Sequence, residues 1–178
     1  MWFLPNCFLL LLSLAMLGAA IDSNGMDRGD GIYIHDDSGQ IVDYMPLDKL
    51  NAREPQVNAT ELDSSPLEAR LTFDVKCFGA KFDKNDLKTG LSYLGDEISA
   101  KVYLYGSIAA RTYLSVKYNS VLTYVCNYSK GKLVPSSAMS GTVNANLDTR
   151  CGDNMAARGD DKSGISYGRT AKGKPFCN

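Results

Sequence analysis

Side chains that could perform acid–base or nucleophilic chemistry are few in this 178-residue sequence. A Ser-His-Asp or Cys-His centre needs a histidine, and the only one, His35, lies in an acidic N-terminal stretch, away from the cysteines that follow. Glu97 and its neighbour Asp96 would make a carboxylate pair, but adjacent positions on a helix point in different directions. No glycine motif that cradles a phosphate follows a predicted strand. We therefore expect no catalytic residue, no cofactor and no enzymatic activity.

The cysteines predict disulfides and not a metal site. Removal of a leader would take away Cys7 and leave four cysteines, at Cys77, Cys126, Cys151 and Cys177. Their gaps of 49, 25 and 26 residues, with no histidine nearby, do not fit the spacing of zinc ligands. In an oxidising compartment an even number of cysteines predicts two disulfides. Three connectivities are open, and we favour Cys77 with Cys177 and Cys126 with Cys151, because the first would tie the opening strand to the chain end.

The first 20 residues predict a secretory signal peptide. An apolar run is followed by three small residues, Gly18, Ala19 and Ala20, after which we expect cleavage. The run lacks a basic start, which leaves a membrane anchor as the alternative, but it is shorter than the roughly 20 apolar residues of a spanning helix. No later stretch is apolar enough to span. We expect a secreted, extracellular mature chain without a membrane span.

Two glycosylation triplets fit a secretory route, Asn58-Ala59-Thr60 and Asn127-Tyr128-Ser129. Asn127 lies next to Cys126 on a predicted strand, so its side chain points to the opposite face from the cysteine. If that face is open to solvent, Asn127 is the better acceptor of a glycan.

The charge divides the mature chain into two parts. Residues 21–70 hold 11 acidic and 4 basic residues, a net charge of −7, whereas residues 71–178 hold 9 acidic and 15 basic residues, a net charge of +6. The first part has no cysteine, three prolines and many Asp, Gly and Ser residues, which predicts a mostly disordered region or propeptide, with room for a small hairpin at 32–42. Residues 71–178 are predicted to form one compact disulfide-bonded domain.

Hydrophobic periodicity predicts an α+β fold for this domain. Residues 111–129 predict a β-hairpin whose three-residue loop, 119–121, would place Leu114 and Leu122 on one buried face with Cys126. Asp83 is predicted to cap one helix, and Ser136 or Ser137 a second helix that Gly152 closes. With strands at 71–77 and near the C-terminus, the order is β-α-β-β-α-β. We expect a two-layer sandwich with an antiparallel sheet and two disulfides.

Basic residues near the hairpin and the C-terminus form a candidate binding set. A basic surface with tyrosines among the lysines is typical of RNA-binding proteins, although a net charge of +6 is modest for that function. The candidate residues are Lys130, Lys132, Arg169, Lys172 and Lys174.

Two resemblances carry expectations about function. The segments Tyr124-Val125-Cys126-Asn127-Tyr128, Cys151-Gly152, Ser166-Tyr167-Gly168-Arg169 and Phe176-Cys177 resemble small secreted proteins of plant-associated filamentous fungi, and the element order is similar to killer-toxin-like α/β sandwiches. This resemblance covers 111–178 and implies a secreted virulence or antagonism factor without enzymatic activity. The segment Phe73-Asp74-Val75-Lys76-Cys77 is similar to the start of ribonuclease-like fungal effectors, in which the first and last cysteines pair. That family has one main helix, so the second predicted helix favours the sandwich.

The expected function is binding, in an effector or toxin-like virulence protein that acts on a host or competitor target and could enter host cells. The target is expected to be a protein. One alternative is a ribonuclease-like fold that binds RNA without efficient cleavage, since the histidine of those nucleases is missing. A second alternative is a structural protein of the cell surface.

Overall fold

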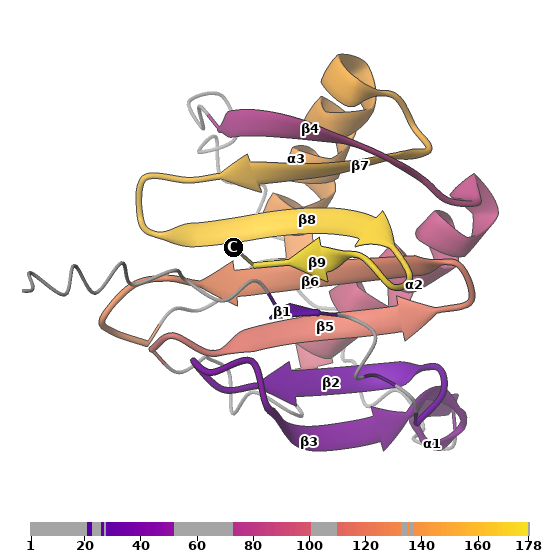
Figure 1. Ribbon diagram of the computed structural model, residues 1–178, viewed down its shortest axis with the longest axis vertical. Coiled ribbons are helices and arrows are strands. Elements are labelled where there is room, and N and C mark those ends of the chain that lie inside the picture. Colours follow the sequence, from indigo (N-terminus) through magenta and orange to yellow (C-terminus); the bar gives the residue numbers. More distant parts are fainter. Residues whose placement is uncertain are drawn as a thin grey trace, which may run out of the picture.

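The computed structural model describes residues 21–22, 26, 28–51, 73–100, 110–132, 135 and 137–177. They form an α+β fold built on a seven-stranded sheet in which every pair of neighbouring strands is antiparallel, with the order β3-β2-β5-β6-β8-β7-β4 (Figure 1). The predicted class, the antiparallel sheet and the two disulfides are confirmed. The chain holds more strands than the predicted order contains.

The central hairpin consists of β5 (Tyr113–Tyr118) and β6 (Val121–Asn127). Tyr118 pairs with Val121, so the turn has two residues and not the predicted three. Asn119 accepts the positive φ of 46° that this tight turn requires, which asparagine tolerates better than most residues. The predicted single buried face is therefore wrong. Leu114 lies opposite Val125 on one face, whereas Cys126 lies on the other.

Both faces of this hairpin are covered, and every residue of β6 is buried. Helices α2 (Lys84–Ala100) and α3 (Ser137–Cys151) pack on one face, which we call the helix face, through contacts to β5, β6 and β7 (Figure 1). On the opposite face, which we call the outer face, β1 (Ile21–Asp22) and β9 (Pro175–Phe176) form a short two-stranded ribbon. A strand that is buried on both sides loses the alternation from which its register could be predicted.

The helix ends agree with the sequence pattern. Asp83 accepts hydrogen bonds from the backbone N–H groups of Asn85 and Asp86 at 2.7 and 3.3 Å, as expected of an N-cap. At the end of α3, Gly152 has φ of 98° and donates its N–H to the Asp148 carbonyl at 2.9 Å. The apolar stripes of both helices face the sheet and form its main core with residues of β5 to β8. These residues include Leu94, Ile98, Val143, Leu147, Leu114, Val116 and Tyr167.

The expectation that the compact part begins at Leu71 is wrong for residues 28–51. Strands β2 (Gly31–His35) and β3 (Ile41–Pro46) form a hairpin, and β2 pairs with β5 along its whole length. The short helix α1 (Leu47–Asn51) follows directly. Ile32 and Tyr33 are completely buried, so this acidic part belongs to the sheet despite its charge. The sequence does not show that this hairpin belongs to the sheet, because its acidic residues, which lie in the turn and on the exposed β3 edge, suggest a disordered segment.

A second strand was missed after α3. Residues 153–164 carry three Asp and two Gly and predict a polar loop, yet β7 (Met155–Asp160) pairs with both β8 (Ile165–Ala171) and β4 (Asp74–Lys81). Ala156 and Ala157 are completely buried, and Arg158 pairs with Asp160. The strand could not be predicted from hydrophobic alternation, because its buried residues are small and its charged residues pair with each other. Residues 101–105, whose pattern fits either the tail of a helix or a short strand, lie outside the described residues.

The disulfides join Cys77 to Cys151 and Cys126 to Cys177, with Cα–Cα distances of 5.5 and 5.7 Å. The pairing that we favoured from the sequence is therefore wrong, because Cys77 and Cys126 lie on opposite faces of the sheet. Cys77 reaches the end of α3 on the helix face, while Cys126 meets the C-terminal segment on the outer face. The chain-entropy relation gives each bridge about 4 kcal/mol, since the loops close over 74 and 51 residues.

Candidate binding surface on the outer face

Residues that lie side by side across four strands build a row on the outer face. Tyr124 of β6 pairs with Gly168 of β8, Gly168 with Arg158 of β7, and Arg158 with Lys76 of β4. Gly168 has no side chain, and a Cβ there would lie 2.3 Å from Cζ of Tyr124. The tyrosine ring therefore lies flat across β8 and extends toward β7. Because residue 168 is a glycine, the Tyr124 ring can occupy the space on the outer face that a side chain at 168 would otherwise fill.

Charged groups continue this row toward the edge of the sheet. Asp160 accepts hydrogen bonds from Ser166 Oγ at 2.6 Å and from Lys76 Nζ at 3.1 Å, and its Oδ1 lies 2.8 Å from Nε of Arg158. Partial burial works to raise the pKa of Asp160, but the hydrogen bonds from Ser166 and Lys76 and the charge of Arg158 outweigh it and lower the pKa. The carboxylate stays ionised and holds both cations in place, Lys76 at the surface and Arg158 buried beneath it at 7 % exposure.

An aromatic side chain flanks the charges on each side. Tyr128 accepts a hydrogen bond from Arg158 at 3.2 Å, and the guanidinium lies 5.9 Å from its ring centre. Burial raises the pKa of Tyr128 to about 12 against the opposing effect of Arg158, so the hydroxyl stays neutral. On the other side stands Phe78, which is 39 % exposed. Lys76, Phe78, Tyr128, Arg158 and Asp160 together are called the outer-face strip below.

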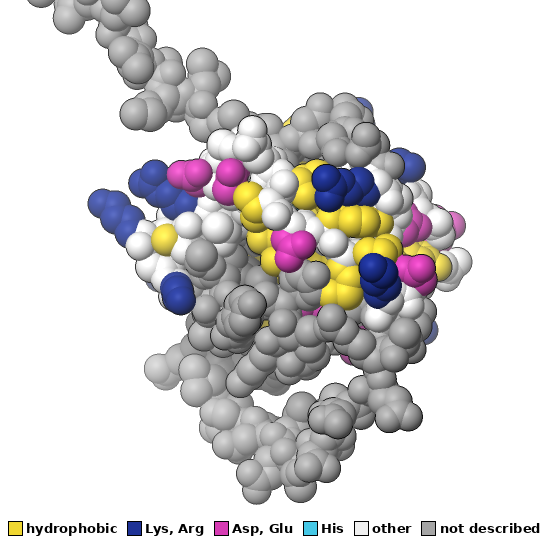
Figure 2. All heavy atoms as spheres, turned by 90° about the horizontal axis from the view of Figure 1, so that it is seen from below, with side chains coloured by type: hydrophobic (Ala, Val, Ile, Leu, Met, Phe, Trp, Pro, Cys, Tyr) yellow, Lys and Arg dark blue, Asp and Glu magenta, His cyan; other side chains and the backbone are white. Residues whose placement is uncertain are grey.

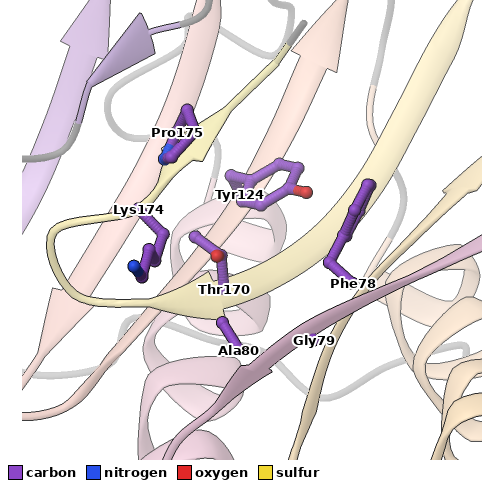
Figure 3. A pocket seen from close by; sticks show the side chains of 7 residues that line it. All are labelled: Phe78, Gly79, Ala80, Tyr124, Thr170, Lys174 and Pro175. Atoms are coloured by element: carbon purple, nitrogen blue, oxygen red, sulfur yellow. The ribbon is translucent and has the colours of Figure 1, made fainter.

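The exposure of Phe78 follows from a bulge in β4. The ladder pairs Cys77 with Ala157 and Lys81 with Met155, so three residues of β4 oppose a single residue of β7. A bulge bends the strand and redirects the side chains within it. A Cβ added at Gly79, in the middle of the bulge, would meet nothing within 4 Å. Phe78 consequently projects over the outer face toward β8 and β9 (Figure 3).

A cavity of about 400 Å³ opens between this bulge and the β9 ribbon. Its wall combines apolar surface from Phe78, Ala80 and Pro175 with the polar ends of three side chains, Tyr124, Thr170 and Lys174 (Figure 3). The cavity adjoins the outer-face strip, since both include Phe78. The outer face thus offers an aromatic and charged surface next to a hollow.

The opposite edge of the sheet has a different character. Seen from the β3 side, hydrophobic side chains lie among scattered basic and acidic ones (Figure 2). Val42 is the most exposed large apolar residue described, at 60 %, and its neighbour Asp43 is also exposed. Among the described residues, this edge brings no arginine or lysine into an ion pair. Substitutions at this edge can therefore serve as controls for substitutions in the outer-face strip.

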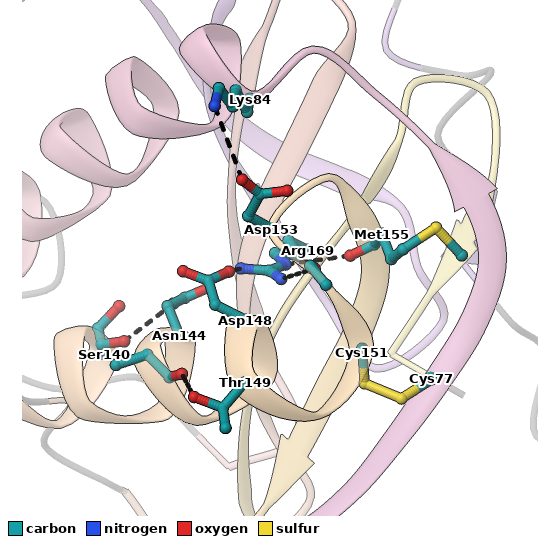
Figure 4. Close-up of polar contacts among 12 residues, drawn as sticks. Cys77, Lys84, Ser140, Asn144, Asp148, Thr149, Cys151, Asp153, Met155 and Arg169 are labelled. Carbon is teal, nitrogen blue, oxygen red and sulfur yellow. Dashed lines mark hydrogen bonds and ion pairs between the residues drawn. A yellow bond between two sulfur atoms is a disulfide. The ribbon is translucent and has the colours of Figure 1, made fainter.

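Of the residues predicted to bind a partner, Arg169 is the clearest error. It is completely buried on the helix face, where it donates hydrogen bonds to Asp148, to the Gly152 carbonyl at 2.8 Å and to the Met155 carbonyl at 3.1 Å (Figure 4). Its guanidinium therefore joins the end of α3 to β7 and cannot contact a ligand. This role could not be predicted, because the sequence around an arginine on a strand does not show whether its side chain is buried or exposed.

The remaining predicted binding residues do not form one surface. Lys130 and Lys132 are exposed beyond the C-terminal end of β6, whereas Lys172 and Lys174 are exposed beyond the end of β8, which pairs with the start of β6. The seven residues of β6 separate the two pairs by roughly 20 Å. Without Arg169, the lysines do not make the continuous basic track that an RNA strand needs.

Asn127 does not suit glycosylation in the folded protein. It is completely buried, its Nδ2 donates to the Gly131 carbonyl at 2.9 Å, and its Oδ1 accepts from the Ser129 N–H at 2.9 Å. A glycan on Nδ2 has no space there, so the expectation that its face is open is wrong. The sequon residues instead form a turn after β6. Asn58 and the predicted signal peptide lie outside the described residues.

His35 is part of the sheet and not of a separate acidic region. Its Nε2 lies 3.1 Å from Ser115 Oγ and its Nδ1 3.4 Å from the Gly39 carbonyl, with Phe176 against the ring. Burial lowers the pKa of His35 to about 4, although the Gly39 carbonyl and Asp36 partly oppose this shift. The pair has the composition of a Ser-His dyad, but the two residues are 1 % and 0 % exposed. A substrate cannot reach them in this structure.

No three His, Cys, Asp or Glu side chains among the described residues come together as a metal site. No helix in that part of the chain is long and apolar enough to cross a membrane. The outer-face strip itself was missed from the sequence. The one signal for it was the alternation of Arg158 and Asp160, which requires knowing that β7 exists.

Comparisons with known proteins leave the family open. No family model matches the chain, and neither the curated proteins nor the solved structures contain a significant match.

Proposed function

We propose that the protein is a secreted, non-catalytic effector or toxin-like protein that binds a protein target of a host or competitor through the outer-face strip. The observation that carries this proposal is the composition of the strip. Phe78 and Tyr128 are two of the three exposed large apolar side chains described, and the strip adds the exposed Lys76, which pairs across the ladder with Arg158, a residue that is 7 % exposed. Tyrosine, phenylalanine and arginine are enriched at the centres of protein interfaces, where a few such residues supply most of the affinity.

The electrostatics of the strip also suit a protein partner. Asp160 neutralises part of the charge of Arg158 and Lys76 and holds both side chains in place, so a partner would meet an ordered surface of mixed charge. Lys76, the exposed cation that Asp160 holds, therefore loses less side-chain entropy on binding than a mobile lysine would. A nucleic acid would favour uncompensated basic residues, and the pairs at Lys130 and Lys172 lie too far apart for that role.

The placement of His35 supports binding in place of turnover. Acid–base catalysis needs a titratable group in reach of substrate with a pKa near the working pH, and His35 lies within the sheet with a pKa of about 4. Two disulfides in a chain of this size support an extracellular setting. This is the combination that the resemblance to secreted fungal effectors implies.

The test uses the protein purified from the medium of a secreting host, with its disulfides intact. A fluorescently labelled sample is titrated onto plant cells and onto fungal competitor cells, with and without excess unlabelled protein. We expect saturable binding that unlabelled protein displaces and that prior protease treatment of the cells abolishes. A parallel panel of RNA, polysaccharide and peptide substrates should show no turnover.

Matched variants locate the surface. Phe78→Ser and Val42→Ser each remove one exposed apolar side chain, from opposite edges of the same sheet. We expect Phe78→Ser to weaken binding at least tenfold, as hot-spot truncation does, and Val42→Ser to change it less than twofold. Multiple-turnover cleavage of any substrate would overturn the proposal, and so would equal loss of binding in the two variants. Binding to RNA with a steep salt dependence would favour the ribonuclease-like alternative.

A further inference from the structure

The two disulfides differ in how easily a thiol reaches them. Cys77 is exposed and Cys151 is half-buried, whereas Cys126 and Cys177 are 0 % and 3 % exposed. Thiol–disulfide exchange needs direct attack by a thiolate on a sulfur, so access decides which bridge a small thiol reduces first. The Cys77–Cys151 bridge is accessible, and the Cys126–Cys177 bridge is enclosed in the buried cluster of the outer face.

The accessible bridge holds the middle of β4. Phe73 and Phe82, directly before and after the strand, are 8 % and 7 % exposed and anchor its two ends in the hydrophobic cores. From Asp74 to Lys81, in contrast, every residue is exposed or half-buried. This stretch lies at the edge of the sheet, and its ladder with β7 is interrupted between Cys77 and Lys81. Stretches with few buried contacts open locally at a low cost in free energy.

The bridge also determines which way the neighbours of Cys77 face. Successive side chains of a strand point to opposite faces, so the link from Cys77 to α3 on the helix face directs Lys76 and Phe78 to the outer face (Figure 3). Lys76 has one further link, its ion pair with Asp160 at 3.1 Å, but its side chain is 49 % exposed and such surface pairs contribute little. Apart from the backbone ladder, the bridge is therefore the main constraint on the β4 part of the outer-face strip.

The α3 end of the bridge is held independently. Cys151 is the last residue of α3, and the buried Arg169 donates hydrogen bonds to the Gly152 carbonyl at 2.8 Å and to the Met155 carbonyl at 3.1 Å (Figure 4). Leu147, one turn earlier, is completely buried in the main core. When the bridge opens, α3 therefore stays in place, and β4 is the element that is released.

Reduction takes two exchange steps and consumes two thiol molecules. The first thiolate attacks one sulfur of the bridge, forms a mixed disulfide with that cysteine and expels the other cysteine as a thiolate, which takes up a proton. The second thiolate attacks the sulfur of the small molecule, leaves with it as a disulfide and releases the remaining cysteine, which is protonated in turn. The two thiols thus supply the two electrons and two protons that the cysteines gain.

We propose that the Cys77–Cys151 disulfide is a redox switch for the outer-face strip. Reduction by a small thiol releases residues 76–80 from the sheet and removes Lys76 and Phe78 from their places in the strip. Target binding is then lost, while the Cys126–Cys177 disulfide and the rest of the sheet remain. The protein binds in an oxidising medium and releases its target in a reducing one. This inference rests on the proposed function, because the strip is the surface that the switch controls.

The first test follows the full secreted protein in buffers with rising ratios of reduced to oxidised glutathione. Free thiols are trapped with N-ethylmaleimide and located by mass spectrometry, and hydrogen exchange is measured at each ratio. We expect a range of ratios in which only Cys77 and Cys151 are reduced. In that range the protected amides of 74–81 should exchange at least tenfold faster, and those of β6 should change less than twofold. Simultaneous opening of both bridges, or unchanged exchange at 74–81, would overturn the proposal.

Variants connect the bridge to binding without any reductant on the cells. Replacing Cys77 and Cys151 together by serine fixes the open state, and we expect its binding to the cells that bind wild type to be at least tenfold weaker. Adding Phe78→Ser to this double variant should weaken binding less than twofold further, because Phe78 has already left the strip. The control is Arg169→Met, which lowers stability with the bridge closed and should keep wild-type binding.

The outcomes separate the switch from the proposed function. Wild-type affinity in the double serine variant overturns the switch, and so does a further tenfold loss when Phe78→Ser is added to it. In both cases the effect of Phe78→Ser on the oxidised protein still tests target binding through the strip. If the oxidised protein binds no cells, the proposed function fails, and hydrogen exchange still decides whether reduction releases residues 76–80.

Discussion

Arg169 is the residue whose role the structure changes most, and its replacement by methionine tests that change. Methionine keeps an unbranched stem that packs in the same space but removes all donors. The substitution removes the arginine hydrogen bonds to the carbonyls of Gly152 and Met155, at a position where the guanidinium is completely buried, and the Gly152 carbonyl keeps only the longer bond from the Met155 N–H at 3.4 Å. We expect the protein to fold with a large loss of stability and an intact outer face.

The size of the loss follows from the three contacts. Each partly buried carbonyl that loses its arginine donor costs about 1 to 3 kcal/mol, whereas Asp148 is 46 % exposed and recovers most of its interaction from water. Removing the buried charge returns part of its desolvation cost, so we expect a net loss of about 3 kcal/mol. That is a large fraction of the 5 to 15 kcal/mol typical of a domain.

Equilibrium unfolding in urea measures this loss, with Asp148→Asn as the control. The control keeps the donors on both carbonyls and should cost about 1 kcal/mol or less, because its partner is partly solvated. Both variants should keep the wild-type dependence on urea. A loss below about 1 kcal/mol for Arg169→Met, or a greater loss for Asp148→Asn, would refute a structural role for this arginine.

Three further predictions concern the disulfides, the histidine and the glycine beneath Tyr124. The Cys77–Cys151 disulfide has one exposed cysteine, whereas both cysteines of Cys126–Cys177 are buried. A mild reductant should therefore open Cys77–Cys151 first, which mass spectrometry of the trapped thiols measures. The reverse order would contradict the assigned exposures. The folded pKa of His35, about 4, lies below the unfolded value of 6.5, so stability should be complete above pH 6.5 and fall by up to about 3 kcal/mol toward pH 4; a His35→Gln variant should lose less over this range, and an equal loss would exclude the histidine as the cause. Gly168→Ala should displace the Tyr124 ring and destabilise the protein by about 1 to 3 kcal/mol, while Gly95→Ala, in open space on α2, should stabilise it by about 0.5 to 1 kcal/mol; calorimetry of both variants would contradict the packing if their signs agreed.

Local signals predicted local structure well. Helix α2 begins after its predicted cap Asp83 and α3 ends at the predicted Gly152, because a cap is a contact between residues at most a few positions apart. Cys77, Cys126, Cys151 and Cys177 form two disulfides, as their even number indicates. The connectivity was out of reach, since it depends on which face of the sheet each cysteine occupies. The face that Cys126 occupies depends on whether the turn at Asn119 has two residues or three.

Long-range pairing decided the rest. The acidic hairpin 31–46 joins the sheet through β5, a partner some 80 positions away in the sequence, and its charge gave the opposite impression. The outer-face strip needs β4 and β7 as neighbours and a bulge in β4 to redirect Phe78. Neither pairing nor bulge leaves a mark in the composition of these strands. Basic residues were the visible candidates from the sequence, and one of them, Arg169, is structural.

The most direct test of target binding through the outer-face strip is photocrosslinking from single positions. A photoreactive phenylalanine analogue placed at Phe78 keeps an aromatic ring on the strip, and the same analogue at Val42 reports on the opposite edge of the sheet. Each protein is bound to the cells that bind wild type and then irradiated. We expect a discrete crosslinked protein from position 78 that excess unlabelled protein prevents, and none from position 42. A specific crosslink from position 42 alone, or none from position 78 while the labelled protein remains bound, would contradict binding through the outer face.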